Sequence, residues 1–233
     1  MNHLNRLLCL CALLLAPALF ATDAFVGKIT LAMSKDKGTP TTMIQTMKGT
    51  SVRIETANAP GAFIMDLAKG EMLILMNEEK MYMVQALNQA DIEKKTKAAA
   101  VDSTVEVTGQ TEKILGYVCS QILVKDDKGI TEMWVSDALG AFSGFGAQGG
   151  GGGGMFGKKK SNSQASSPWE QALKTQGGFP MRVVSHDKKG IETYRMEVTK
   201  VEKGGVTEKD FLPPEDFTKF AMPDMGGMMN PFK

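Results

Sequence analysis

Apolar and polar side chains alternate along most of the chain between residues 24 and 201. In one such segment, Val52 and Ile54 alternate with Arg53 and Glu55. Successive side chains of an extended strand point to opposite faces of a sheet, so a period of two indicates strands with one buried face. The pattern therefore predicts that β-strands make up most of the folded chain.

Lys-Gly pairs separate many of the alternating segments, at residues 37–38, 48–49, 69–70, 128–129, 189–190 and 203–204. Glycine adopts the positive φ that a tight hairpin turn needs, and the lysine beside it keeps the turn in water. Strands joined by successive hairpins form an antiparallel meander, which must close or curl to hide its edges. We predict ten or eleven short strands, near residues 24–34, 42–48, 51–57, 62–68, 71–77, 80–86, 103–109, 115–125, 130–136, 180–187 and 190–203.

Residues 72–76 are apolar at every position, so this strand must be covered on both of its faces. Helical signals are few and short. They predict a surface helix at residues 89–100, a capped turn at 136–139, a helix with a capping box at 167–176 and a last turn at 214–220. The predicted fold class is mainly β with short helices, as a curved antiparallel meander covered by helices.

Residues 1–21 have the three parts of a secretory signal peptide: a polar start with Arg6, an apolar run and small residues before a cleavage site. The apolar run at residues 7–15 is too short to anchor the chain in a bilayer. Cys9 and Cys11 lack the small-residue context of a lipoprotein cysteine. We therefore expect export to the periplasm, cleavage after Ala21 and no lipidation.

Residues 22–220 are predicted to form a single domain, since 42% hydrophobic and 23% charged residues are ordinary for a globular chain. Residues 143–167 contain six consecutive glycines, three lysines and no acidic residue, which predicts a flexible insertion. Residues 221–233 are predicted to form a mobile, methionine-rich tail.

Few side chains beyond residue 21 could carry out catalysis. His186 is the one histidine there and stands beside a predicted turn, where a solvated role is expected, and no G-x-S-x-G elbow supplies a nucleophile. Cys119 is the one cysteine there, so we predict a buried, reduced thiol. The net charge of +1 provides no field that would steer the chain onto nucleic acid. We therefore predict no enzyme activity, no cofactor and no nucleic-acid partner.

Methionine is the strongest departure from ordinary composition, with 17 residues. Several lie two apart within predicted strands, which is consistent with core packing. The alternative is a deformable lining for an apolar ligand, because methionine combines free rotation with a polarisable sulfur. The candidate lining consists of Met65, Met72, Ile74, Met76, Met81, Met83 and Met133.

Two further segments suggest other partners. Thioethers are soft ligands for Cu(I), so the tail could hold copper through Met222, Met225, Met228 and Met229, although no other metal site is indicated. The basic run Lys158, Lys159 and Lys160 could contact an anionic membrane surface or an envelope protein.

Short motifs resemble a known family. They lie at residues 114–119, 131–136, 179–181 and 211–217. Together with the exported, hairpin-rich chain, they resemble the bacterial family called domain of unknown function 4412, whose members are similar to the LolA/LolB-like lipoprotein carriers. The resemblance implies a half-barrel of about eleven strands wrapped around short helices, with acyl chains held between sheet and helices.

The leading hypothesis is therefore a periplasmic binding protein for an apolar ligand, such as a lipid or a lipoprotein acyl chain. A structural or interaction module of the cell envelope, without a ligand, is the alternative. A periplasmic Cu(I)-binding protein is a further alternative.

Overall fold

The computed structural model describes residues 25–57, 59–87, 103–140, 142 and 167–220. The helical elements of this part are η1 (Asp137–Leu139), α2 (Pro168–Gln176) and η3 (Glu208–Phe211). The strands are β1 (Gly27–Lys35), β2 (Thr41–Lys48), β3 (Ser51–Thr56), β4 (Gly61–Asp66), β5 (Glu71–Met76), β6 (Met81–Ala86), β7 (Thr104–Ile114), β8 (Tyr117–Lys125), β9 (Gly129–Ser136), β10 (Phe179–Asp187), β11 (Glu192–Lys203) and β12 (Thr218–Lys219).

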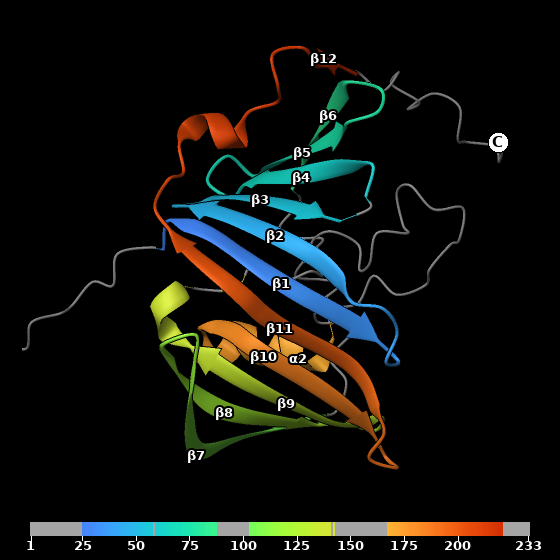
Figure 1. Cartoon of the computed structure of the whole chain (residues 1–233), viewed down its shortest axis with the longest axis vertical. Helices are drawn as coiled ribbons and strands as arrows, with labels where there is room; N and C mark the ends of the chain where they lie inside the picture. Colours follow the sequence, from blue (N-terminus) through green and yellow to red (C-terminus); the bar gives the residue numbers. More distant parts are fainter. Residues whose placement is uncertain (1–24, 58, 88–102, 141, 143–166, 221–233) are drawn as a thin grey trace, which may run out of the picture.

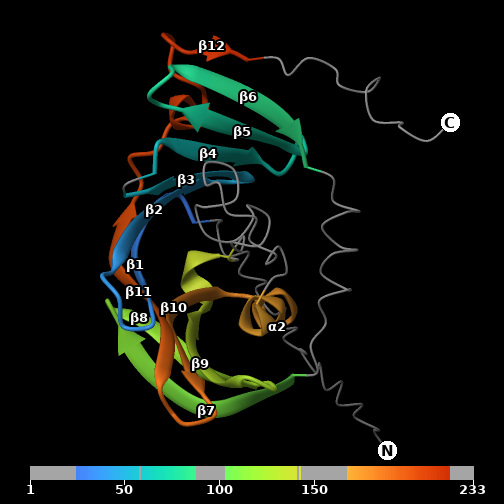
Figure 2. The same cartoon turned by 90° about the vertical axis from the view of Figure 1, so that its right-hand side faces the viewer.

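All twelve strands belong to one sheet, in the order β12-β6-β5-β4-β3-β2-β1-β11-β10-β9-β8-β7. Neighbouring strands are antiparallel, except that β12 runs parallel to β6. The sheet curves strongly but stays open, with α2 on its concave side (Figure 2). Figure 1 views the convex side, so α2 lies behind β10. The prediction of a mainly β, curved antiparallel meander with short helices is confirmed.

β-bulges help the sheet to bend. The register shifts between Thr30 and Leu31, between Pro180 and Arg182, and between Val107 and Thr111. A bulge adds a residue to one strand and increases the local twist, so several of them in one sheet favour curvature. Glu112 on β7 forms an ion pair with Arg182 on β10 at 2.9 Å, although β8 and β9 lie between these strands in the sheet order.

The local helical signals agree with the structure at two of the four predicted places. Ser167 caps α2 in a capping box with Glu170, and the helix ends at Gly177, where φ is 81°. Ser136 caps η1 by accepting a hydrogen bond from the backbone N–H of Ala138. The predicted helix at residues 89–100 lies outside the described residues.

The predicted turn at residues 214–220 is present only in its first part, where Phe217 N–H donates to Pro214 O, because the last part forms the twelfth strand. The backbone N–H of Thr218 donates to Lys80 O, and that of Phe220 donates to Tyr82 O. Strand β6 would otherwise leave an edge unpaired, and backbone pairing with that edge prevails over a weak helical signal. The predicted segments at residues 1–21 and 221–233 lie outside the described residues, as does the predicted insertion 143–167 apart from Ser167.

The C-terminal segment covers the convex face of β4 and β5. Its Val206 and Phe211 pack against Ala62, Ile64 and Leu75 in a second, smaller hydrophobic cluster. On the opposite face of β5, Met72 and Ile74 belong to the main core. Residues 72–76 are therefore apolar at every position because both faces of β5 are packed, as predicted.

Candidate functional site

The concave face of the sheet is the candidate functional site, because it carries the main hydrophobic core. Strand register identifies this face: Tyr194 on β11 stacks on Trp169 of α2, with ring centroids 6.2 Å apart. Met196 and Val198 follow Tyr194 at a spacing of two and pair with Met33 and Leu31 of β1. The same alternation continues strand by strand across the sheet, so one apolar lining extends from β5 to β9.

Four of the seven residues predicted to form the lining are buried in this core: Met65, Met72, Ile74 and Met133. Met65 and Met133 lie on strands separated by five others in the sheet, and the curvature places both in one cluster. Met83 is partly buried and packs against the same core.

Met76 and Met81 lie at the margin of the lining. They pair with each other across β5 and β6, on the face that also carries Ile74 and Met83. Both are only half-buried and stand where the two strands meet in a hairpin. The structure therefore places all seven predicted residues on one side of the sheet.

Further methionines of the lining were not among the candidates. The buried concave core also contains Met43, Met47, Met181 and Met196. The spacing of Met43 and Met47 in an alternating strand could have predicted the first two. Met181 lies in the bulge between Pro180 and Arg182, and its spacing of two from Phe179 and Val183 could also have predicted its face.

Gln45 is the polar exception in this lining. It is fully buried, and it pairs across β1 and β3 with Ile29 and Ile54, both of the concave core. Sequence analysis did not single it out, because glutamine is usually exposed, although its spacing of two from Met43 and Met47 places it on their face of the strand.

Aromatic contacts hold α2 over the part of the concave face formed by β9, β10 and β11. Trp169 stacks on Phe142 and on Tyr194, and Phe142 meets Phe179 of β10 edge-on. Burial raises the pKa of the Tyr194 hydroxyl, which is therefore neutral at physiological pH. Stacked rings thus help to hold the helix against the sheet.

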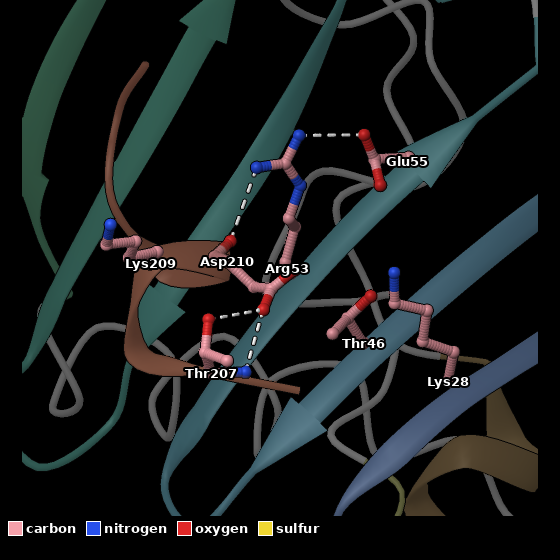
Figure 3. Close-up of a pocket in the computed structure, with 7 residues that line it drawn as sticks. All are labelled: Lys28, Thr46, Arg53, Glu55, Thr207, Lys209 and Asp210. Carbon is pink, nitrogen blue, oxygen red and sulfur yellow. Dashed lines mark hydrogen bonds and ion pairs between the residues drawn. The ribbon is translucent and has the colours of Figure 1, made fainter. Parts of the chain in front are cut away.

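A polar depression of about 340 Å³ lies on the convex face, beneath η3 (Figure 3). The Arg53 guanidinium donates to the backbone oxygen of Asp210 at 3.3 Å and pairs with Glu55 at 2.8 Å. The Asp210 carboxylate accepts from the N–H and hydroxyl of Thr207, and the backbone hydrogen bond lowers its pKa. These groups already bind one another. Their hydrogen bonds hold the C-terminal segment against the convex face of the sheet.

A second depression on the convex face, also about 340 Å³, is lined by charged groups of β9, β10 and β11 together with Val184. Its arginines are likewise paired within the fold: Arg182 binds Glu112 and Glu197, and Arg195 binds Glu192. His186 lines this depression, and the described residues contain no group of three or more His, Cys, Asp or Glu placed to hold a metal ion. The proposed copper ligands of the tail and Lys158, Lys159 and Lys160 lie outside the described residues.

Cys119 is a buried free thiol, as predicted. Burial raises its pKa, so the thiol stays protonated and unreactive in the folded protein. We expect a thiol reagent at about pH 8 to label Cys119 at least about a hundred times more slowly in buffer than in denaturing urea. Mass spectrometry of quenched samples measures both rates, and equally fast labelling in the two solvents would contradict the burial.

The fold and this lining define the class of protein: an open, strongly curved antiparallel sheet with an apolar concave face and a helix held against it. The chain belongs to the family described as "Domain of unknown function (DUF4412)", which it matches over residues 25–217. Membership of this family was predicted from the sequence and is confirmed. No curated protein matches the chain. No helix of the described residues has the length and apolar character needed to cross a membrane.

Solved structures with similar folds share little sequence with this chain. An uncharacterised conserved protein from Thermus thermophilus is 9% identical, with 83% of this chain and 89% of that chain covered and a TM-score of 0.43. A LolA superfamily protein from Nitrosomonas europaea is 11% identical, with 83% and 91% covered and a TM-score of 0.30. The MucA/MucB complex from Pseudomonas aeruginosa is 9% identical, with 81% of this chain and 56% of that chain covered and a TM-score of 0.44.

Proposed function

We propose that this protein is a periplasmic, non-enzymatic binding protein for an apolar ligand, such as a lipid or a lipoprotein acyl chain. The ligand lies against the concave face, between the sheet and α2. The observation that supports the proposal is the methionine-rich lining, which continues from β5 to β9 on one face of an open sheet.

The lining suits a ligand of irregular apolar shape. Methionine side chains rotate freely and re-pack around different chains, whereas branched residues hold one shape. Each ligand CH₂ that leaves water contributes about 0.8 kcal/mol, so an acyl chain gains affinity along its whole length. The open edges at β7 and β12 leave the sheet free to change its curvature as the ligand enters.

The proposal is tested on protein purified from the periplasm. Native mass spectrometry should detect lipid that co-purifies with the protein, and the delipidated protein should take up a fluorescent fatty acid. Failure of both measurements would overturn the proposal. Recovery of the protein only from the cytoplasm would overturn its location.

A matched pair of substitutions on β6 locates the ligand. Met83 packs against the concave core, whereas Val84 beside it points to the other face and is exposed. We expect Met83→Glu to weaken fatty-acid uptake at least about ten-fold, because the ligand would desolvate a carboxylate. Val84→Glu puts the same charge on the same strand and should leave uptake unchanged. Fluorescence titration of both variants measures the affinities, and equal effects would place the ligand elsewhere.

A second candidate function, a ligand-free interaction module of the cell envelope, is favoured by exposed apolar side chains on the β7–β8 hairpin. Val107, Leu115 and Val118 are all more than half exposed. Apolar side chains on an edge hairpin are typical of contacts with another chain. This candidate predicts no lipid uptake, so the measurements above distinguish the two.

A further inference from the structure

Gln45 places a carboxamide in the middle of the apolar lining. It stands on β2 between Met43 and Met47, which share its face of the strand, and opposite Ile29 and Ile54 on the two neighbouring strands. All four neighbours belong to the buried concave core. The Gln45 side chain is therefore directed into the region where the proposed function places an acyl chain.

Neither amide atom of this side chain is satisfied by the part of the protein that the structure describes. Gln45 is fully buried, and neither its Nε2 nor its Oε1 has a hydrogen-bond partner among the residues that the structure describes. Burying a carboxamide without partners destabilises a folded protein, and native structures pair nearly all such groups. A leucine or methionine would fill the same position without this penalty, so the amide needs a reason outside core packing.

The surroundings of Gln45 define the chemistry of a matching group. The amide has one donor atom, Nε2, and one acceptor atom, Oε1, so a group that both accepts and donates gives each of them a partner. An ester can only accept, which leaves Oε1 unpaired. The four neighbouring side chains carry no charge, and Lys28 and Arg53 stand on the opposite face, where they line the depression beneath η3. Among these described neighbours a carboxylate would therefore be a buried charge without a counter-ion, whereas a neutral carboxyl or a primary carboxamide fits.

We propose, building on the function proposed above, that Gln45 is the polar anchor of the concave site and binds the terminal group of an acyl chain through a pair of hydrogen bonds. Its Nε2 donates to the ligand carbonyl, and its Oε1 accepts from the acid O–H or amide N–H of the same group. The apolar lining thus supplies affinity, and this one side chain fixes how far the chain enters. A few polar groups in an apolar pocket act in this way in small-molecule sites generally.

Three probes with the same chain test the anchor: palmitamide, palmitic acid and methyl palmitate, each displacing the uncharged dye Nile red. We expect palmitamide to bind at least about ten-fold more tightly than methyl palmitate, because the ester leaves a buried acceptor unpaired. Palmitic acid should bind more tightly as the pH falls from about 8 to about 5, since the bound form is the neutral acid. The affinity for palmitamide should not change over that range.

The variant Gln45→Leu separates the anchor from the lining. It should reduce the ratio of palmitamide to methyl palmitate affinity to about one, and methyl palmitate itself should still bind. A ratio is insensitive to a general loss of folded protein, which affects both probes equally. A ratio that stays at the wild-type value in Gln45→Leu would overturn the anchor.

Stability without ligand provides a second readout. Gln45→Leu should shift the urea midpoint upward, because it removes an unpaired buried amide. The matched control is Gln121, which is also buried but accepts a hydrogen bond from Thr108 Oγ1 at 2.8 Å. Gln121→Leu should shift the midpoint downward. A downward shift in Gln45→Leu as well would show that its amide is already satisfied and would overturn the anchor.

The outcomes separate this inference from the function on which it rests. If the wild-type protein binds none of the three probes, the proposed function and the anchor both fail. If it binds all three with equal affinity, the lining binds acyl chains and only the anchor fails.

Discussion

Gly61→Ala is expected to lower the free energy of unfolding by about 3 kcal/mol, although the substitution adds one methyl group. Gly61 begins β4 and pairs with Met76 of β5. A Cβ at this position would lie 1.8 Å from the backbone oxygen of Leu75 and 2.9 Å from its carbonyl carbon. A backbone oxygen cannot rotate away as a side chain can, so β4 and β5 must separate and the cores on both faces must shift.

Gly49→Ala is the control for Gly61→Ala. Gly49 has a φ of +59° in the hairpin between β2 and β3, and its added Cβ would meet no atom within 4 Å. We expect Gly49→Ala to lower the free energy of unfolding by about 1 kcal/mol, because the only penalty is an alanine in a left-handed backbone conformation. Urea unfolding followed by tryptophan fluorescence compares the two variants. If Gly61→Ala lowers the free energy of unfolding no more than Gly49→Ala does, then β4 and β5 can separate at little cost and the expectation is wrong.

Trp169→Ala is expected to lower the free energy of unfolding by about 3 to 5 kcal/mol, the usual range for removing a large buried aromatic side chain. Trp169 is 6% exposed and joins α2 to both Phe142 and Tyr194. Without this ring, the nine-residue helix loses its largest buried side chain and keeps the smaller Ala172 and Leu173 in the core. We therefore expect α2 to open locally before the sheet unfolds.

Hydrogen exchange measures this local opening directly. In Trp169→Ala, the backbone amides of α2 should exchange faster than in the wild type by a larger factor than those of β1 and β11. Trp169→Phe retains a stacking ring and should lose less than half as much stability. Uniformly faster exchange in α2 and the central strands would show that the helix and the sheet unfold as one unit.

Most of the strands could be predicted from the sequence, because a strand with one buried face leaves a local, periodic trace. Met65, Met72 and Ile74 follow this period, so their common face could be predicted together with the strands that carry them. The bounds were less accurate where the backbone is irregular. Strand β7 extends to Ile114 rather than to residue 109, because the bulge after Val107 interrupts the alternation without ending the pairing.

Two features of the structure could not be predicted from the strand pattern: the unpaired amide of the concave face and the packing of the C-terminal segment on the convex face. The alternation places Gln45 on the same face as Met43 and Met47, but its complete burial and its unpaired amide follow only from the packing of the whole sheet. Likewise, Thr207 and Asp210 form a capping box for η3, but nothing nearby in the sequence indicates that Phe211 packs on the convex face of β4 and β5.

The sequence by itself determined which segments are extended, where most of the chain turns and which side chains share a face, because these properties depend on neighbours a few residues away. Only the tertiary structure decided that β1 pairs with β11 across some 165 residues, that β12 joins the edge of β6 in parallel, and that a lone amide lies within the methionine lining. The backbone of any exposed strand edge can form hydrogen bonds with any other edge. Which strands pair therefore depends on the packing of the whole sheet rather than on a local sequence pattern.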